Sequence, residues 1–119
     1  MPGTGPDKAL ENLRAICLAL PETTETLTWG HPNFRVDNKI FCSFGGEHLG
    51  LSAISLKVGL EHQPLFLADP RFFKTPYVGN KGWVSLKVEG RMNWTEVREL
   101  VCASYRLIAP KRLGKLLPP

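Results

Sequence analysis

The stretch TWGHPNFRV, residues 28–36, holds the side chains best suited to chemistry in this sequence. The imidazole of His31 is of the type that serves as a general base or a metal ligand. A metal site needs further ligands, however, and neither His48 nor His62 lies at an HxH or HxxxH spacing from it. The alternative is structural, because the flanking Gly and Pro favour a turn into a strand, where a His ring bonds a backbone group. We favour the structural interpretation and retain Trp29 and His31 as a candidate pocket.

Other reactive groups are sparse. Cys17, Cys42 and Cys102 are odd in number, far apart and without a CxxC pair, which argues against a disulfide scaffold and against a zinc site. Each lies in an apolar stretch, so we expect buried thiols rather than a nucleophile. The carboxylates of Asp37 and Asp69 stand at turns, where they make turn hydrogen bonds. We therefore expect no catalytic residue, no metal site and no cofactor, and we do not expect an enzyme.

A second stretch, TPYVGNKGWVSL at residues 75–86, combines glycines, a lysine and two aromatic residues. It is a weak phosphate-loop candidate, because GxxxxGK[ST] is absent and the loop precedes a strand rather than a helix. A flexible, wing-like loop that presents Tyr77, Lys81 and Trp83 is a more natural interpretation, since lysine and aromatic side chains suit phosphate contact and base stacking. A Trp83 packed at the rim and a merely solvated Lys81 remain an equal alternative.

The net charge of +4 is unevenly distributed. Residues 1–70 carry five Lys and Arg against eight Asp and Glu, a net of −3, whereas residues 71–119 carry ten against three, a net of +7. Such asymmetry favours a polyanionic partner, although mildly basic soluble enzymes that bind no nucleic acid are common. Part of the basic excess lies near the end of the last expected helix, where cations also complement the helix dipole: Arg98, Arg106, Lys111, Arg112 and Lys115.

The size and composition favour one domain over residues 1–119 with a single core, because the chain has 119 residues and is 43% hydrophobic. No apolar run approaches the roughly 20 residues of a membrane helix, and the N-terminal residues lack the pattern of a secretory signal. We expect a soluble, cytoplasmic monomer without a membrane partner. Residues 1–6 and 113–119 are expected to be loosely ordered.

Three helices are expected. The first spans about residues 7–20, with an apolar stripe at spacings of three and four, and a short one spans residues 60–68. The last begins at Asn93, where Glu96 completes a capping-box-like start, and ends before Pro110. Its expected buried stripe is Val97, Leu100, Val101, Tyr105 and Ile108.

Strands occupy most of the middle of the chain. Residues 34–36 and 39–44 predict a hairpin around Asp37 and Asn38, with Ile40, Cys42 and Phe44 on one face. Further strands are expected at residues 51–58, from residue 72 onward and at residues 83–88, while PETTET at residues 21–26 is expected to be a linker.

This order of elements predicts an α+β fold with a mainly antiparallel sheet and helices packed on one face. The other face would then be open to solvent. Strict alternation along the strands gathers six residues there, provided that the register is correct, because a slip of one residue would reverse the faces. The six are Arg35, Ser55, Lys57, Trp83, Ser85 and Lys87.

Four separated motifs resemble the MmcQ/YjbR-like family, in order from about Leu13 to Arg112: LPETTETLTWGHPNFRVDNKIF, LSAISLKV, TPYVGNKGWVSL and SYRLIAPK. The resemblance implies a CyaY-like two-layer sandwich, in which helices pack on an antiparallel sheet. This fold has been described as a "double wing" related to DNA-binding modules, so the resemblance also implies a DNA-binding role, and it supplies no catalytic residue. The matching positions are Trp29, Gly30, His31, Pro32, Phe34, Val36, Lys39, Phe41, Lys57, Tyr77, Lys81, Gly82, Trp83, Val84, Ser104 and Tyr105.

Three hypotheses for function follow. The first is a DNA-binding module that contacts mainly phosphates, weakly at physiological salt. The second is a domain that binds a small anionic metabolite, or acts on it, in a pocket that includes Trp29 and His31, and the third is a protein-interaction adaptor with an exposed apolar patch. For the first hypothesis the candidate contact residues are Arg35, Lys57, Tyr77, Lys81, Trp83 and Lys87.

Overall fold

A computed structural model describes residues 6–28, 30–45 and 52–118 of the chain. Its helices are α1 (Pro6–Leu18), α2 (Gln63–Leu67), α3 (Trp94–Ile108) and α4 (Lys111–Gly114), with a 3-10 turn η2 (Gly79–Lys81). Its strands are β1 (Thr24–Thr28), β2 (His31–Val36), β3 (Lys39–Gly45), β4 (Ala53–Lys57), β5 (Phe72–Lys74) and β6 (Trp83–Lys87).

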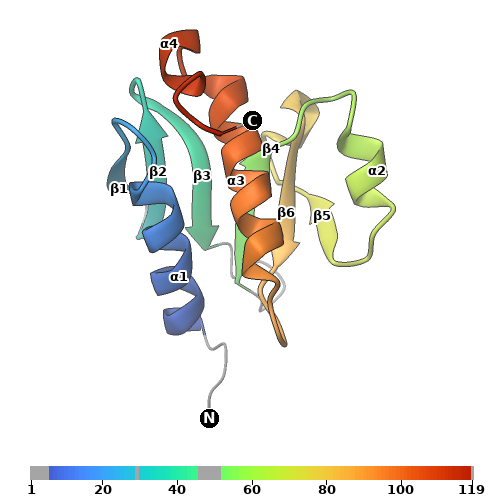
Figure 1. The fold of residues 1–119 in the computed structure, drawn as a ribbon. Coiled ribbons are helices and arrows are strands. Elements are labelled where there is room, and N and C mark those ends of the chain that lie inside the picture. Colours follow the sequence, from blue (N-terminus) through green and yellow to red (C-terminus); the bar gives the residue numbers. More distant parts are fainter. Residues whose placement is uncertain (1–5, 29, 46–51, 119) are drawn as a thin grey trace.

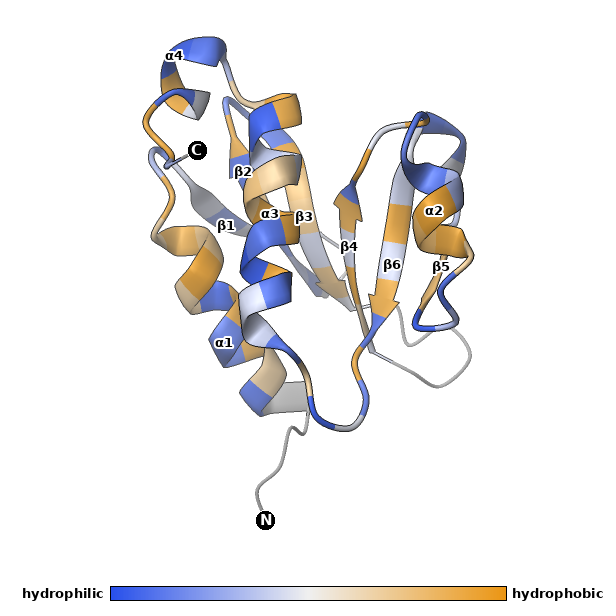
Figure 2. Ribbon diagram, turned by 45° about the vertical axis from the view of Figure 1, so that its right-hand side comes forward, coloured by the Kyte–Doolittle hydropathy of each residue, from blue (hydrophilic) through white to orange (hydrophobic). Residues whose placement is uncertain are grey.

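The strands form one sheet in the order β1-β2-β3-β4-β6-β5, and every neighbouring pair is antiparallel. α1 and α3 lie side by side over one face of this sheet (Figure 1). Along these helices and along β4 and β6, hydrophobic residues are interspersed with hydrophilic ones, as elements with one buried face require (Figure 2). The core lies between the two layers and includes Leu13, Phe34, Ile54, Val84 and Val101. The expected α+β sandwich is thus confirmed.

The β2–β3 hairpin departs from the expected alternation. Asp37 and Asn38 both have positive φ, +53° and +63°, as a tight two-residue hairpin turn requires. Phe34 pairs with Cys42 but Arg35 pairs with Ile40, so β3 carries one extra residue, a β-bulge. The prediction that Ile40 shares a face with Cys42 and Phe44 is therefore wrong. The bulge turns Ile40 toward the face of Arg35 and leaves Phe41 and Cys42 both fully buried.

The bulge also interrupts the pairing of β3 with β4, and a side chain of α3 hydrogen-bonds to both strands at the interruption. The β3–β4 register starts at Cys42 and Leu56. Beside it, the hydroxyl of Ser104 accepts a hydrogen bond of 3.0 Å from the Lys57 backbone N–H and donates one of 2.6 Å to the Phe41 carbonyl. Ser104 is fully buried, so these are the two bonds a buried hydroxyl needs. One side chain of α3 therefore fixes the helix to two strands.

The segment expected to be a linker is instead the edge strand β1. Thr24 pairs with Arg35 and Thr28 with His31, so PETTET leads directly into the sheet. Glu25, on the helix side of this strand, forms a two-pronged ion pair with Arg14 of α1, at 2.6 and 2.8 Å. This bond also raises the pKa of the Arg14 guanidinium. The sequence of β1 is too polar to predict a strand, because β1 lies at the edge of the sheet, where one face is solvated.

The C-terminal residues are not the loosely ordered tail that was expected. Residues 111–114 form α4, and Leu113 and Leu117 are buried in the core. Arg112 pairs with Glu22 across 3.0 Å, which ties this segment to the start of β1. Nearby, the Tyr105 hydroxyl donates a bond of 2.6 Å to the carbonyl of Pro21. Residues 1–5 and 119 lie outside the described residues.

The two long helices agree with the sequence analysis. α1 buries Ala9, Leu13 and Cys17, and α3 buries Val97, Val101 and Tyr105. Asn93 caps α3, since its side-chain oxygen accepts a bond of 3.0 Å from the N–H of Glu96. α2 is shorter than the predicted residues 60–68.

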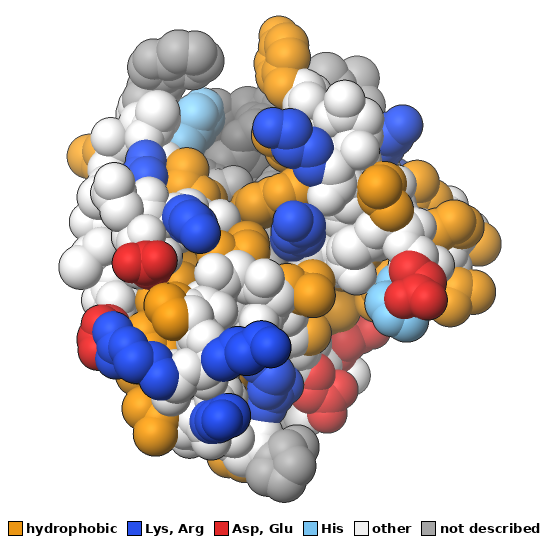
Figure 3. All heavy atoms as spheres, turned by 90° about the horizontal axis from the view of Figure 1, so that it is seen from above, with side chains coloured by type: hydrophobic (Ala, Val, Ile, Leu, Met, Phe, Trp, Pro, Cys, Tyr) orange, Lys and Arg blue, Asp and Glu red, His pale blue; other side chains and the backbone are white. Residues whose placement is uncertain are grey.

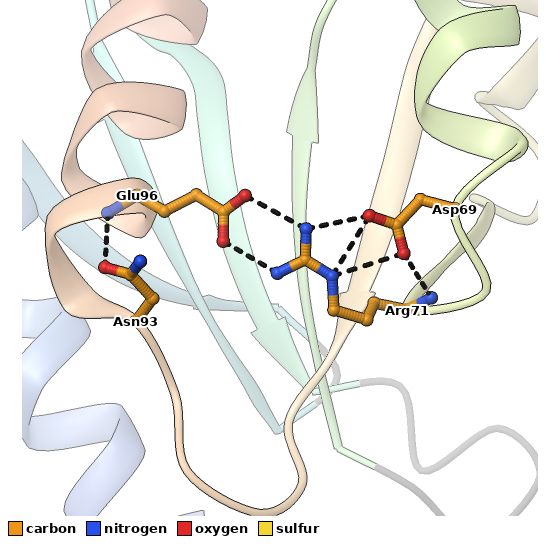
Figure 4. A network of polar contacts seen from close by, with 4 residues as sticks. All are labelled: Asp69, Arg71, Asn93 and Glu96. Carbon is orange, nitrogen blue, oxygen red and sulfur yellow. Dashed lines mark hydrogen bonds and ion pairs between the residues drawn. The ribbon is translucent and has the colours of Figure 1, made fainter.

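A polar network joins the corner between α2 and β5 to the start of α3 (Figure 4). Arg71 donates to the carboxylates of Asp69, at 2.8 Å, and Glu96, at 2.7 Å. The two carboxylates raise the pKa of Arg71, and the side-chain and backbone bonds from Arg71 lower the pKa of Asp69. The network therefore holds two elements of the helix layer together through charge.

Removing the Ser104 hydroxyl tests whether its two hydrogen bonds stabilise the fold at the bulge. Ser104→Ala leaves the Lys57 N–H and the Phe41 carbonyl without their partner, so we expect the free energy of unfolding to fall by about 1 to 3 kcal/mol. Urea unfolding followed by circular dichroism measures the change. Thr95→Ala, which removes an exposed hydroxyl from the same helix, is the matched control and should change stability by less than about 0.5 kcal/mol. Equal effects of the two substitutions would contradict this role of Ser104.

The Arg71 network predicts a pH dependence. A carboxyl whose pKa is lowered by folding adds stability that is present above its unfolded pKa and is lost as the pH falls through its folded pKa. Asp69→Asn should therefore flatten the loss of stability below about pH 4. Urea midpoints from about pH 3 to pH 7 measure this, with Glu99→Gln on the exposed side of α3 as the control. Profiles of the same steepness for wild type and Asp69→Asn would contradict the prediction.

Candidate functional site

The face of the sheet turned away from α1 and α3, here called the open face, brings the predicted residues together. Lys57 pairs with Trp83, Ser55 with Ser85, and Ala53 with Lys87. Paired residues share a face and side chains alternate along a strand, so these six lie on one side of the sheet. The register through Asn33, Ser43 and Ser55 places Arg35 on the same side. Alternation therefore predicted the grouping of Arg35, Ser55, Lys57, Trp83, Ser85 and Lys87 correctly.

A band of small polar side chains crosses the middle of the open face. The register places Thr26, Asn33, Ser43, Ser55 and Ser85 in one row across five strands. The Ser85 hydroxyl lies 2.8 Å from that of Ser55 and 2.9 Å from that of Thr75. Ser85 is buried although it belongs to the open face. We call this row, together with Thr75, the polar band.

Cations flank the polar band on two sides. Lys57 follows Ser55 by two residues in β4, and Lys87 follows Ser85 by two residues in the antiparallel β6, so the two lysines lie beyond opposite edges of the band. Arg35 lies on the Lys57 side. Its guanidinium donates to the Thr26 hydroxyl and to the Asn38 carbonyl, both at 3.1 Å. Both partners are neutral, so the positive charge of Arg35 is held in place without being neutralised.

No described strand residue of the open face is Asp or Glu. Ion pairs join Arg14 to Glu25, Arg71 to Glu96 and Arg112 to Glu22. These pairs lie in the helix layer or in the strands and turns next to it. Figure 3 shows the end of the molecule that includes α4, and Lys and Arg side chains are spread widely over it. The surface is hollowed at the upper edge of this view. The open-face cations therefore meet no carboxylate on the described strands of their own face, although positive charge is not confined to that face.

The loop before β6, which the sequence predicts to be flexible and wing-like, is held to the rest of the molecule at several points. Buried Gln63 donates to the carbonyls of Gly79, at 2.7 Å, and Trp83, at 2.9 Å. The carbonyl of Gly82 accepts from the N–H groups of Val58 and Gly59. A Cβ on Gly82 would lie 2.7 Å from the Gly59 carbonyl carbon, so only glycine allows these backbones to meet. Trp83 is half-buried at this anchor, whereas Lys81 is exposed.

A hollow of about 410 Å³ opens over the polar band. Its floor includes Asn33, Ser43, Ser55 and Ser85, and the loop residues Thr75, Pro76 and Tyr77 line it from the β5 side. The Tyr77 side chain is 98% exposed, so it stands at the mouth of the hollow rather than inside it. Sequence analysis missed Gln63, Thr75 and this hollow, because six strands and a loop must be assembled before the hollow exists.

His31 lines the other side of the hollow and depends on a glycine. The ring lies over Gly45 of β3, where an added Cβ would come within 2.3 Å of Nδ1. Gly45 also has a φ of +151°. Trp29, the other residue of the candidate pocket, lies outside the described residues. Trp83 does not line the hollow, so the structure separates it from His31.

The other reactive groups are placed as follows. Within the described parts of the chain, no three His, Cys, Asp or Glu residues are grouped as metal ligands would be. Cys17 and Cys42 are buried, and burial raises the pKa of the Cys17 thiol. No helix in residues 6–28, 30–45 and 52–118 is long and apolar enough to cross a membrane.

Comparisons with known proteins agree with the fold. A family model described as YjbR matches residues 18–107. The crystal structure of a Deinococcus radiodurans protein with a DUF419 domain is similar, with a TM-score of 0.75 and 23% identity over 96% of this chain and 92% of that one. A Pseudomonas syringae protein structure is similar with a TM-score of 0.67 and 16% identity, over 87% and 98% of the two chains. No curated protein matches the chain.

The contact between His31 and Gly45 can be tested directly. Gly45→Ala should displace the imidazole, because Cβ and ring cannot both keep their places, and should shift the His31 ring signals in ¹H–¹³C spectra. Gly59→Ala is the matched control: its φ is also positive, +90°, but an added Cβ meets nothing within 4 Å. Both variants should lose stability from backbone strain, of order 1 kcal/mol. Unchanged His31 signals in Gly45→Ala would contradict the placement of the ring.

Proposed function

The chain belongs to the YjbR family, and from this premise we propose that it is a DNA-binding module whose open face contacts the phosphate backbone. The observation that carries the proposal is the composition of that face: Arg35, Lys57 and Lys87 share it with Trp83 and with no described carboxylate of the sheet. Phosphate contacts from Lys and Arg supply most of the affinity of such proteins and carry little sequence information.

The face is suited to a polymer rather than to a compact anion. Lys57 and Lys87 lie beyond opposite edges of the polar band, four residues apart along the strand direction, or roughly 13 Å. Successive phosphates of a strand that follows the sheet can contact both lysines. Tyr77 lies beside the hollow and is fully accessible for contact, and Lys81 of the same loop is exposed.

The remaining hypotheses have less support. No described residue that lines the hollow is Lys or Arg, so among these residues an anionic metabolite would meet His31, Asn33 and hydroxyl groups. An adaptor surface would need a contiguous exposed apolar patch. Tyr77 is exposed beside the open face, whereas the exposed leucines near α2, Leu60, Leu65 and Leu67, lie on another element, so these side chains are divided between two parts of the surface.

Salt-dependent binding of labelled DNA tests the proposal. Fluorescence anisotropy from about 25 to 200 mM salt should show saturable binding, with a log–log slope near −3 if about three phosphates are neutralised. Lys57→Ala and Lys87→Ala should each weaken binding and reduce the magnitude of the slope by about one. Lys8→Ala removes the same charge from exposed α1 and is the matched control. No binding at the lowest salt, or an equal loss in Lys8→Ala, would falsify the proposal.

A further inference from the structure

The hollow over the polar band combines hydrogen-bonding side chains with apolar ones such as Phe44, Phe73 and Val78. Asn33, Ser43, Ser55 and Thr75 supply an amide and three hydroxyls, while Ser85 is buried and its hydroxyl is bonded to those of Ser55 and Thr75. Hydroxyl groups both donate and accept, so they adapt to either kind of atom on a ligand. With a volume of about 410 Å³, the hollow falls within the range of sites for small organic groups.

Among the described residues that line the hollow, none is Lys, Arg, Asp or Glu. A charged ligand buried there would lose its hydration without gaining an opposite charge, which is unfavourable. A neutral group with several hydrogen-bonding atoms loses much less hydration free energy. The described lining therefore favours an uncharged group that has polar edges and an apolar face.

Aromatic side chains form part of the wall and the mouth. Phe73 pairs with Ser85 in the sheet and lines the hollow, and Tyr77 stands at its mouth. Tyr77 has a φ of +68° and is the middle residue of a three-residue turn, closed by a bond of 2.7 Å from the Val78 N–H to the Pro76 carbonyl. This conformation is costly for a tyrosine. It keeps a large ring in solvent beside the hollow.

We infer that the hollow receives one unstacked base of single-stranded DNA, an inference that rests on the proposed function. A nucleobase is neutral, flat and edged with donors and acceptors. The polar band can bond such an edge, and Tyr77 can stack on the flat face, as aromatic residues do in single-strand binding proteins. The phosphates on either side of that base then meet Lys57 and Arg35 beyond one edge of the band and Lys87 beyond the other.

The inference predicts that the domain distinguishes bases from backbone. Two labelled single strands of equal length and charge serve as probes, one of thymidine residues and one of abasic residues. In fluorescence anisotropy at low salt, the thymidine strand should bind about five- to a hundredfold more tightly than the abasic strand. Lys57→Ala should weaken both strands by the same factor, because both carry the same phosphates.

Variants of the hollow should act on the thymidine strand alone. Tyr77→Gly removes the ring and suits the positive φ, so the fold is preserved while the preference for bases falls to near unity. Tyr77→Phe keeps the ring and should keep the preference. Ser43→Val, which removes a hydroxyl of the band and suits a strand, should lower the preference without changing binding to the abasic strand.

The outcomes separate the two proposals. Equal binding of both strands by the wild-type protein overturns the base site and leaves phosphate binding standing. Failure to bind either strand overturns the proposed function and the base site together. If Tyr77→Gly weakens both strands equally, Tyr77 contacts the backbone and the base site is overturned.

Discussion

One hydroxyl group, that of Ser104, sits where the two layers and the central strands of this fold meet. The bulge at Phe41 leaves a carbonyl of β3 and the N–H of Lys57 without ladder partners, and Ser104 bonds to both from within α3. The bulge also decides which side chains face which way. It allows Phe41 and Cys42 to enter the core together, and it turns Ile40 toward the face of Arg35. The bulge therefore determines which side chains near the start of β3 reach the open face.

Charge is divided between the two sides of the sheet. On the helix side and around its margins, Arg14, Arg71 and Arg112 each meet a carboxylate. On the open face, Arg35 bonds only neutral oxygens, and no described strand carboxylate opposes Lys57 or Lys87. Exposed ion pairs add little to stability, so this arrangement matters more for the electrostatic field than for folding.

The sequence predicted the parts of the fold in which apolar and polar residues alternate. Strands β4 and β6 alternate strictly, so the open-face positions of Lys57 and Lys87 could be assigned from sequence. β3 reads IFCSF over its middle, and apolar residues on both faces conceal a bulge. β1 reads TETLT, which is too polar to predict a strand from sequence. In the structure, Glu25 of this strand pairs with Arg14 of α1.

The candidate site was predicted in part for the same reason. Residues on one strand pair could be placed on one face, but the hollow depends on a loop from beyond β5 reaching over the sheet. Gln63, which anchors that loop through the carbonyls of Gly79 and Trp83, carries no sequence signal, because an isolated glutamine in a short helix is usually solvated. The glycines of the loop indicated flexibility, yet Gly82 serves a close approach of two backbones.

The central claim, that DNA lies on the open face, is tested most directly with a spin-labelled single strand and methyl NMR. The account predicts that the strand broadens methyl signals of the open face, from Thr26, Ala53 and Thr75. The methyl signals of Ala15 and Ala103, exposed on α1 and α3, should stay sharp because the sheet lies between them and the strand. Broadening of Ala15 and Ala103 with sharp open-face signals would contradict the account and place the nucleic acid on the helix layer.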